Sequence, residues 1–407
     1  ALDGSEASLE KGRERAVRVV RAFEAEFGAR PQAALFSGPG RTEIGGNHTD
    51  HQHGRVLCGS VDLDMLACAA PNGTDLVRIQ SEGYPALEVD LRDLRVREEE
   101  KNSSPALVRG VAARLAELGC RPAGFDAYVT STVLSGSGLS SSAAYEILVA
   151  TIIDCFFGGG TLDPVERAKV GQYAENVYFG KPCGLMDQMG SSVGGAVAID
   201  FADPAAPVVQ KVEYDFARSG HALCIVDTGS CHADLTDDYA DITREMGAVA
   251  AHFGKKFLRD VDEGDFRAAL PQLREECGDR AVLRAMHFFE EDCRAEQEAQ
   301  ALERGDFDAF LALVDQSGLS SALNLQNTWS AAAPQQQAIP VALAVGRELL
   351  GGSGAIRVHG GGFAGTIQAF VPNGKLETFR RGMEELLGPG MCHILHIRPQ
   401  GGCVVLK

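Results

Sequence analysis

The segment GRTEIGGNHTDHQHG, residues 40–54, holds one arginine, one asparagine, three histidines and an aspartate among four glycines. Short polar side chains at fixed spacing can donate to and accept from the adjacent hydroxyls of a sugar, and Asp50 can accept from two hydroxyls at once. The alternative is a zinc site made by His48, His51 and His53, which suit zinc by ligand type. No cysteine lies at zinc-finger spacing and no HExxH helix is present, so we rank zinc well below the sugar site.

A second segment, STVLSGSGLSSSAAYEILVATIIDCFF, has the features of an anion-binding loop. A predicted strand ends, glycines alternate with serines, and a helix is expected directly after Ser142. A helix N-terminus offers unpaired N–H groups and the positive end of the helix dipole, which together favour a phosphate. Gly136 and Gly138 allow close approach of the backbone. The loop is not a Walker A motif, and a plain Ser/Gly turn is the alternative.

Two further segments hold glycines and carboxylates in apolar surroundings. RVHGGGFAGTIQAF places three consecutive glycines between two predicted strands, at a cost of about 0.5 to 1 kcal/mol each relative to alanine. Either a tight turn or close approach to a nucleotide or to the phosphate loop would explain them. AENVYFGKPCGLMDQMGSSVGG contains Glu175 and Asp187, which are either surface carboxylates or paired, metal-bound or functional ones.

The pattern along the chain predicts the elements that position these segments. A helix is expected up to Gly28, and four β-rich runs that follow predict strands of one sheet. A helix at 105–119 and a strand at 124–134 lead into the serine-rich loop. Amphipathic helices are expected from about residue 230 to 315, before strands return at 354–360, 365–371 and 403–407. This mixed order favours an α+β fold, with a domain boundary between residues 200 and 220.

Composition limits the function classes. Lys+Arg of 38 against Asp+Glu of 56 gives a net charge of −18, which argues against a nucleic-acid partner. The eleven cysteines are scattered singly, which fits a reducing compartment. We find no signal-peptide pattern and no window of about eighteen apolar residues, so we expect a cytoplasmic protein without a membrane partner.

Taken together, the four segments resemble the GHMP kinase family and, within it, the galactokinase branch. Residues 40–54 are similar to the sugar signature GRxNxIGEHTDYxxG, and LSGSGLSSSAA to the phosphate loop PxxGGLSSSAA. GGGFAGTIQAF is similar to GGGFGGxxxxL, and AENVYFGKPCGLMDQ to AExxxxGxxCGxMDQ. The four motifs follow the order and spacing of the family over almost the whole chain.

The resemblance implies a two-domain GHMP kinase fold with the active site between the domains. Residues 1–215 would form an N-terminal domain like ribosomal protein S5, and residues 216–407 a ferredoxin-like C-terminal domain with extra helices. The implied reaction is ATP-dependent phosphorylation of the anomeric hydroxyl of galactose, giving galactose 1-phosphate and ADP, with Mg²⁺ as cofactor. We expect a monomer whose partners are the sugar and ATP alone.

The resemblance also implies roles for individual residues. Asp187 would accept the proton of the attacking hydroxyl or orient it, and Arg41 would pair with Asp187 and stabilise charge on the transferred group. An aspartate beside an arginine is expected to stay ionised at neutral pH. The sugar residues would be Asn47, His48, Asp50, Gly184 and Tyr239. The ATP residues would be Ser135, Gly136, Ser137, Gly138, Leu139, Ser140, Ser141 and Ser142. Mg²⁺ would be held by Ser141 and Glu175.

One departure from the family pattern leaves the identity of the sugar open. Asn47 stands where the signature has a glutamate, so an amide replaces a carboxylate that usually binds a hydroxyl. A kinase for another pyranose, an N-acetylhexosamine or L-arabinose is therefore an alternative. A non-catalytic galactose sensor is a third hypothesis, which the intact Ser142-Ala143-Ala144 stretch disfavours. Leu134 replaces the proline that begins the phosphate loop, which changes the stiffness of the turn but not its chemistry.

Overall fold

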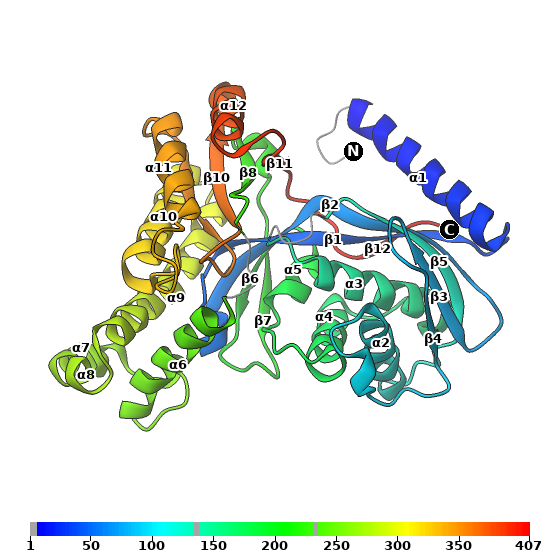
Figure 1. Ribbon diagram of the computed structural model, residues 1–407, viewed down its shortest axis with the longest axis horizontal. Coiled ribbons are helices and arrows are strands. Elements are labelled where there is room, and N and C mark those ends of the chain that lie inside the picture. The colour runs from blue at the N-terminus through cyan, green and yellow to red at the C-terminus, as the bar shows by residue number, and fades with distance from the viewer. Residues whose placement is uncertain (1–5, 134–137, 231–234) are drawn as a thin grey trace.

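Two β-sheets with helices packed on them make up the computed structural model, which describes residues 6–133, 138–230 and 235–407 (Figure 1). The first sheet has the order β12-β1-β2-β5-β3-β4, with β6 also paired to β2 and β7 to β6. Its strands are β1 (Ala34–Gly45), β2 (Arg55–Pro71), β3 (Leu76–Ser81), β4 (Leu87–Asp90), β5 (Phe125–Ser131), β6 (Ala196–Asp200), β7 (Val208–Val212) and β12 (Cys403–Leu406). The strands β1 to β4 lie where the sequence predicts strands of one sheet, and β5 lies where it predicts the strand that leads into the serine-rich loop.

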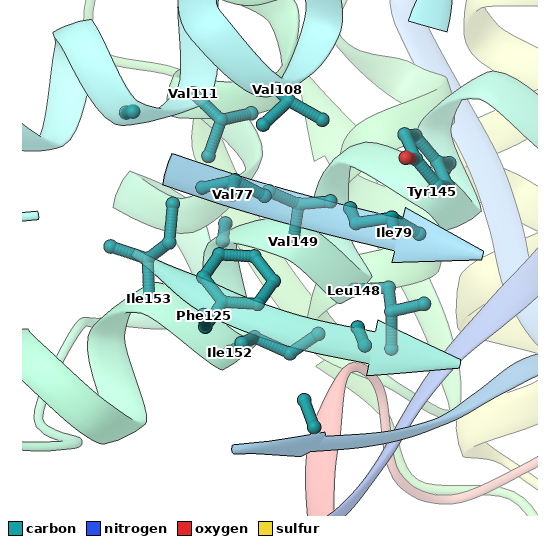
Figure 2. Close-up of a cluster of buried hydrophobic side chains, with 14 of the residues drawn as sticks. Val77, Ile79, Val108, Val111, Phe125, Tyr145, Leu148, Val149, Ile152 and Ile153 are labelled. Atoms are coloured by element: carbon teal, nitrogen blue, oxygen red, sulfur yellow. The ribbon is translucent and has the colours of Figure 1, made fainter. Parts of the chain in front are cut away.

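The first sheet is covered on both faces, because its strands alternate apolar side chains between the faces. Phe36 packs in the core under α2 and α3, whereas Leu35, the residue before it, packs against α1. Figure 2 shows the larger core, in which valines of α2 and the apolar face of α3 meet β3 and β5. The helices of this half are α1 (Glu6–Phe27), α2 (Ser104–Glu117), α3 (Ser141–Ile153), α4 (Pro164–Tyr173) and α5 (Met186–Val193).

The second sheet is antiparallel, with the order β11-β8-β10-β9. Its strands are β8 (His221–Asp227), β9 (Ala355–His359), β10 (Thr366–Pro372) and β11 (Cys392–Leu395). One face packs on α11 and α12. The other contributes Leu223, Ile225 and Phe370 to a core shared with α9, α10 and the first-sheet residues Ile44 and Leu57. This shared core fixes the end of β1 relative to the second sheet.

The amphipathic stretches predicted between about residues 230 and 315 form α6 (Thr236–His252), α7 (Glu263–Ala268), α8 (Leu270–Glu276), α9 (Asp279–Glu303) and α10 (Phe307–Ser320). The helices α11 (Ala338–Leu350) and α12 (Leu376–Leu387) lie beyond these stretches and were not predicted. Helices α6 and α9 enclose their own apolar core, centred on residues such as Met246 and Phe288. The α+β class predicted from the sequence is confirmed.

The division between the sheets falls between β7 and β8, the region where the sequence predicts a domain boundary. The exact domain boundary at residue 215 stays a proposal. A single boundary does not separate the two sheets completely, because β12 returns from the far end of the chain to pair with β1. Leu35 lies opposite Leu406, and Phe36 opposite Val404. The N-terminal sheet therefore includes a strand from the second half of the sequence.

One prediction about apolar windows is wrong. Ser141–Gly158 is, by length and composition, long and apolar enough to cross a membrane. However, 67% of this window is buried inside the fold, because it forms the central helix α3 and the turn after it. Burial in a protein core accounts for its apolar composition.

Candidate active site

The structure brings Arg41, Asp187 and the serine-rich loop together although they lie far apart in the sequence. Arg41, on β1, donates from Nε and Nη2 to Oδ1 of Asp187 at 2.8 and 2.5 Å. Ser140 donates its hydroxyl proton to the other oxygen, Oδ2 of Asp187. Arg41 also donates to the carbonyl of Gly138. One carboxylate thus links the arginine of the first motif to the phosphate loop.

Burial and charge oppose each other at Arg41, whose exposure is 6%. Burial alone would lower the pKa of Arg41, but the charge of Asp187 and its hydrogen bonds outweigh burial, and the pKa is raised. The side chain of Asp187 keeps 26% exposure. Asp187 lies in the first turn of α5, where backbone N–H groups and the helix dipole favour a negative charge. The pair is therefore a fixed ion pair with the carboxylate turned toward a cavity.

The described part of the phosphate loop begins at Gly138. Its φ of +70° is the left-handed conformation that glycine adopts without strain, and a Cβ there would lie 3.2 Å from His359 and from Thr366. Ser140 also has a positive φ, of 56°, and α3 begins at Ser141, two residues earlier than the sequence predicts. The predicted ATP residues Ser135, Gly136 and Ser137 lie outside the described residues. The rest of that set, 138–142, enters the N-terminus of α3, with Leu139 fully buried beneath it.

A cavity of about 190 Å³ opens beside Asp187. Four of the five predicted sugar residues line it, and Tyr239 does not. The lining is Arg41, Glu43, Asn47, His48, Asp50, His51, Lys181, Pro182, Cys183, Gly184, Met186, Asp187, Gly360 and Gly361. Its size suits one small molecule, and its charged groups converge from β1, the loop after it and the 181–187 segment, while the glycine turn closes one side. These are the features expected of a small-molecule site.

His48 and Asp50 both line this cavity, and each has one acceptor atom that no described residue uses. Nε2 of His48 donates to the carbonyl of Gly361 at 2.9 Å, which leaves Nδ1 as an acceptor. Burial lowers the pKa of His48 to about 4, so the ring is neutral. Oδ1 of Asp50 accepts from the backbone N–H and the ring of His51 at 2.9 and 2.8 Å. Oδ2 of Asp50 faces Gly184, where a Cβ would lie only 2.3 Å from it, so a larger residue at position 184 would displace this carboxylate.

Asn47 lies in the wall of the cavity with its side chain fully occupied by the protein. Nδ2 donates to Oε1 of Glu43 at 2.9 Å and to the carbonyl of Gly360 at 2.7 Å. Oδ1 accepts from Ser321 at 3.2 Å and from Asn327 at 2.8 Å. The exposure of Asn47 is 0%. An amide with both protons and both lone pairs in use has nothing left for a sugar, so this arrangement argues against the predicted direct contact.

The glycine turn between β9 and β10 is hydrogen-bonded to the loop after β1 that carries Asn47 and His48. The carbonyls of Gly360 and Gly361 accept from Asn47 and His48, and that of Gly362 accepts from the hydroxyl of Tyr239 at 2.8 Å. The ring of Tyr239 stacks on His48 with centroids 6.3 Å apart, and it lines a neighbouring cavity of about 590 Å³ that shares a wall with the first. The glycines thus form a tight turn and also allow a close approach of two segments. The segment that they approach is the first motif, residues 40–54, and not a nucleotide or the phosphate loop as expected from the sequence.

The predicted metal ligand Glu175 is far from α3 in sequence but lies beside the N-terminus of that helix, and its exposure is 1%. Ser142 donates to its Oε1 at 3.1 Å, Lys181 lies 3.5 Å from the same oxygen, and Gln188 donates to Oε2 at 2.8 Å. The hydroxyl of Ser141 makes no hydrogen bond to another described residue. Gln188 also donates to Glu146, whose other oxygen, Oε1, is buried without a partner among the described residues. Burial, with the nearby Glu175, raises the pKa of Glu146 well above its usual range.

A zinc site finds no support. Within the described ranges, no group of three or more His, Cys, Asp or Glu side chains has an arrangement that could hold a metal ion. His48 is bonded to Gly361, and His53 stacks on Phe257 with centroids 3.6 Å apart. A larger cavity of about 720 Å³, between β7, β8 and β11, contains none of the predicted site residues. The convergence of charged groups, and not cavity size, identifies the site.

Comparison with known proteins agrees with this geometry. The profile of the family described as "GHMP kinases N terminal domain" matches residues 106–195, and that described as "Galactokinase galactose-binding signature" matches residues 21–71. A galactokinase from Streptomyces coelicolor is 31% identical over 363 residues, which cover 89% of this chain and 90% of the relative. The chain belongs to the galactokinase family. A second galactokinase, from Glaesserella parasuis, is 30% identical over 88% of this chain and 90% of its own length.

Solved structures show the same fold. The galactokinase of Lactococcus lactis, crystallised with galactose, superposes with a TM-score of 0.80 at 23% identity, over 95% of this chain and 99% of its own. A mevalonate kinase superposes with a TM-score of 0.64 at 14% identity, over 90% and 99%. The two-domain GHMP kinase fold predicted from the motifs is therefore confirmed.

Three residues of the site escaped the sequence reasoning. Glu43 lines the cavity, and the galactokinase signature GRxNxIGEHTDYxxG has an asparagine at that position, so the departure was visible in the motif itself. Lys181 falls at a variable position of AExxxxGxxCGxMDQ, where no pattern singles it out. Gln188 is the last letter of the same motif, and its bridging of Glu146 and Glu175 depends on the fold.

Proposed function

We propose that this chain transfers the γ-phosphoryl group of ATP to the anomeric hydroxyl of galactose, giving galactose 1-phosphate and ADP. The observation that carries the proposal is the position of Asp187, which contacts the phosphate loop through Ser140 and lines the sugar cavity on its other side. A hydroxyl bound in the cavity and a phosphate bound at the loop would meet at this carboxylate.

The contacts of Asp187 define what it can do in the reaction. An ionised carboxylate has about four acceptor positions. Two are used by Arg41 and one by Ser140, which leaves one on Oδ2 for the attacking hydroxyl. Asp187 can therefore orient the hydroxyl and accept its proton as the new P–O bond forms. Arg41, held by the same carboxylate and by Gly138, is placed to stabilise charge on the transferred group.

The opposite end of the cavity would bind the remaining hydroxyls. Nδ1 of His48 and Oδ2 of Asp50 are acceptors at fixed positions, each held by a protein partner on its other atom. Tyr239 supports the ring of His48 from behind. Positioning of this kind lowers the barrier because the hydroxyl arrives already aligned with the phosphate.

The residues near Glu175 fit a magnesium ion. Carboxylate and hydroxyl oxygens are the ligands that this hard cation prefers, and a site with one or two carboxylates completed by phosphates and water is usual for it. Glu175 and Ser141 would hold the ion, while Ser142 and Gln188 fix the orientation of Glu175. The ion held there would supply positive charge to offset the negative charge of the ATP phosphates.

A coupled assay of ADP release over a panel of sugars tests the proposal. The panel contains galactose, other pyranoses, an N-acetylhexosamine and L-arabinose, each with ATP and Mg²⁺. We expect turnover on galactose to exceed that on every other sugar in kcat/KM. If another sugar is turned over preferentially, the proposed substrate is wrong. If calorimetry shows that galactose binds but no ADP is released, the protein is a galactose sensor and not a kinase. The family assignment and the serine-rich loop favour the kinase.

We also propose a cytoplasmic, monomeric enzyme whose partners are the sugar and ATP. The acidic net charge of −18 supports the absence of a nucleic-acid partner. Sedimentation at micromolar concentration tests the monomer, and a dimer mass would contradict it.

A further inference from the structure

Glu43 is the one carboxylate of the sugar cavity to which neither the motifs nor the proposed mechanism gives a role. It lies on β1 two residues beyond Arg41, and both side chains line the cavity. Its exposure is 4%. A carboxylate this buried is usually paired or functional.

The protein holds Glu43 by one oxygen and leaves the other open. Oε1 accepts from Nδ2 of Asn47 at 2.9 Å and from Nη2 of Arg357 at 2.6 Å. Arg357 is fully buried and is itself fixed by the carbonyls of Ile44 and Val358. Oε2 accepts no hydrogen bond from a described residue. It is also not among the side-chain atoms that are both inaccessible to solvent and without a hydrogen-bond partner, so it is accessible. The free oxygen is therefore in contact with the cavity.

The amide at position 47 has the opposite arrangement. Its four hydrogen bonds all go to protein groups, to Glu43 and Gly360 on one side and to Ser321 and Asn327 on the other. The family signature has asparagine at position 43 and glutamate at position 47, and this chain has the reverse. The two side chains touch, so the exchange keeps one carboxylate and one amide in the same place and swaps the backbone positions from which they come.

We propose that Glu43, and not Asn47, hydrogen-bonds a hydroxyl of the sugar in this chain, while Asn47 and Arg357 act as positioning residues for its carboxylate. The inference rests on the assignment of this cavity to the sugar. The carboxylate arises from the rigid strand β1 and not from the loop after it, and a buried arginine balances its charge.

Four variants test the exchange: Glu43→Asn, Asn47→Glu, the double variant carrying both, and Glu43→Gln. The first three form a double-mutant cycle. Glu43→Gln keeps the shape of the side chain and the acceptor toward Arg357 but presents an NH₂ group in place of Oε2. For each, calorimetry gives the Kd for galactose, and the coupled assay gives the KM values for galactose and ATP.

We expect Glu43→Asn and Glu43→Gln to weaken galactose binding about tenfold to a hundredfold, the loss typical of a hydrogen bond to a charged group. The KM for ATP should change less than twofold. Asn47→Glu alone places two carboxylates in contact and should weaken galactose binding as well. The double variant restores the family pair and should bind galactose at least fivefold more tightly than either of its two single variants.

A matched control is Glu298→Gln, which alters a buried glutamate that does not line the cavity. It should leave the galactose Kd within twofold of the wild type. Thermal unfolding of every variant separates misfolding from loss of contact, and if Glu43→Asn does not fold, Glu43→Gln and the double variant still decide. Unchanged galactose binding in Glu43→Gln overturns the inference. So does a double variant whose loss of binding free energy for galactose equals the sum of the losses in the two single variants.

Failure of this inference is distinguishable from failure of the proposed function. If the wild type prefers another sugar in the panel, the proposed substrate is wrong, and the same cycle is run with the preferred sugar. If the wild type phosphorylates galactose but the cycle shows no coupling, only the role of Glu43 is wrong.

Discussion

Replacement of Asp187 by asparagine tests the centre of the proposed mechanism with little change in shape. The amide oxygen can still accept from Arg41 in place of Oδ1. The NH₂ group takes the place of Oδ2, which in the wild type accepts from Ser140 and has one remaining acceptor position. The variant therefore removes the acceptor for the attacking hydroxyl while keeping most of the packing.

The size of the effect follows from these contacts. General-base and orienting contributions of a placed carboxylate are about 10²- to 10⁴-fold. At 1.36 kcal/mol for each factor of ten, this is roughly 3 to 5 kcal/mol of activation free energy. The fold should lose less, because charge-assisted hydrogen bonds contribute about 1.5 to 3 kcal/mol and the 26% exposure of Asp187 lets water compensate in part.

The assay measures kcat and both KM values by ADP release, with urea unfolding on the same preparation. We expect kcat to fall by at least a hundredfold, with the KM for galactose changed less than tenfold. Ser140→Ala is the matched control, since it removes the partner of Oδ2 and leaves the carboxylate charge, and its kcat should fall about tenfold or less. A folded Asp187→Asn enzyme with kcat within tenfold of the wild type would refute the catalytic assignment.

Three further predictions concern stability and sugar binding. Both carboxyl oxygens of Glu298 are buried without a hydrogen-bond partner among the described residues, and burial raises the pKa of Glu298 well above 4.5. Its stabilising contribution is therefore greatest below pH 4.5 and is lost as the pH rises toward the folded-state pKa. Glu298→Met should thus raise the free energy of unfolding at pH 7 by about 1 to 3 kcal/mol and flatten its pH dependence, and a lower free energy would contradict this. A Cβ at Gly362, where φ is +81°, would lie 2.1 Å from the carbonyl of Asn327, so Gly362→Ala should raise the KM for galactose several-fold, and the open-space control Gly374→Ala should not. The charge of Asp50 raises the pKa of His51 to about 9, so galactose binding should weaken as the pH rises from about 8 to 10 in the wild type. An equally steep pH dependence of galactose binding in His51→Gln would show that His51 is not the cause.

Local pattern predicted most of the elements and the membership of the site. The β-rich runs at residues 55–71 and 75–81 became β2 and β3, and the motif aspartate and arginine proved to be in contact. The hydrogen-bond partners within the site were not predictable in the same way. Arg357 reaches Glu43 across 314 positions of sequence, and Asn327 reaches Asn47 across 280. Periodicity specifies which face of a strand is buried, but not which distant side chain meets it there.

The exchange at positions 43 and 47 shows the limit of matching one residue at a time. The motif comparison detected the missing glutamate at position 47 and left the sugar in doubt. The new glutamate at position 43 cannot be linked to position 47 from the motif alone, because contact between the two side chains depends on the bend of the chain at Gly46, with φ of 86°. Only coordinates reveal that the carboxylate is still present in the cavity wall.

The pairing of β12 with β1 has a practical consequence for protein engineering. Chimaeras assembled from two relatives by joining their halves near residue 215 would combine an edge strand from one parent with the arginine-bearing strand of the other. Exchanging residues 403–406 together with the N-terminal half would keep the parental partners, and such hybrids should be recovered as soluble enzyme more often than those cut at a single crossover.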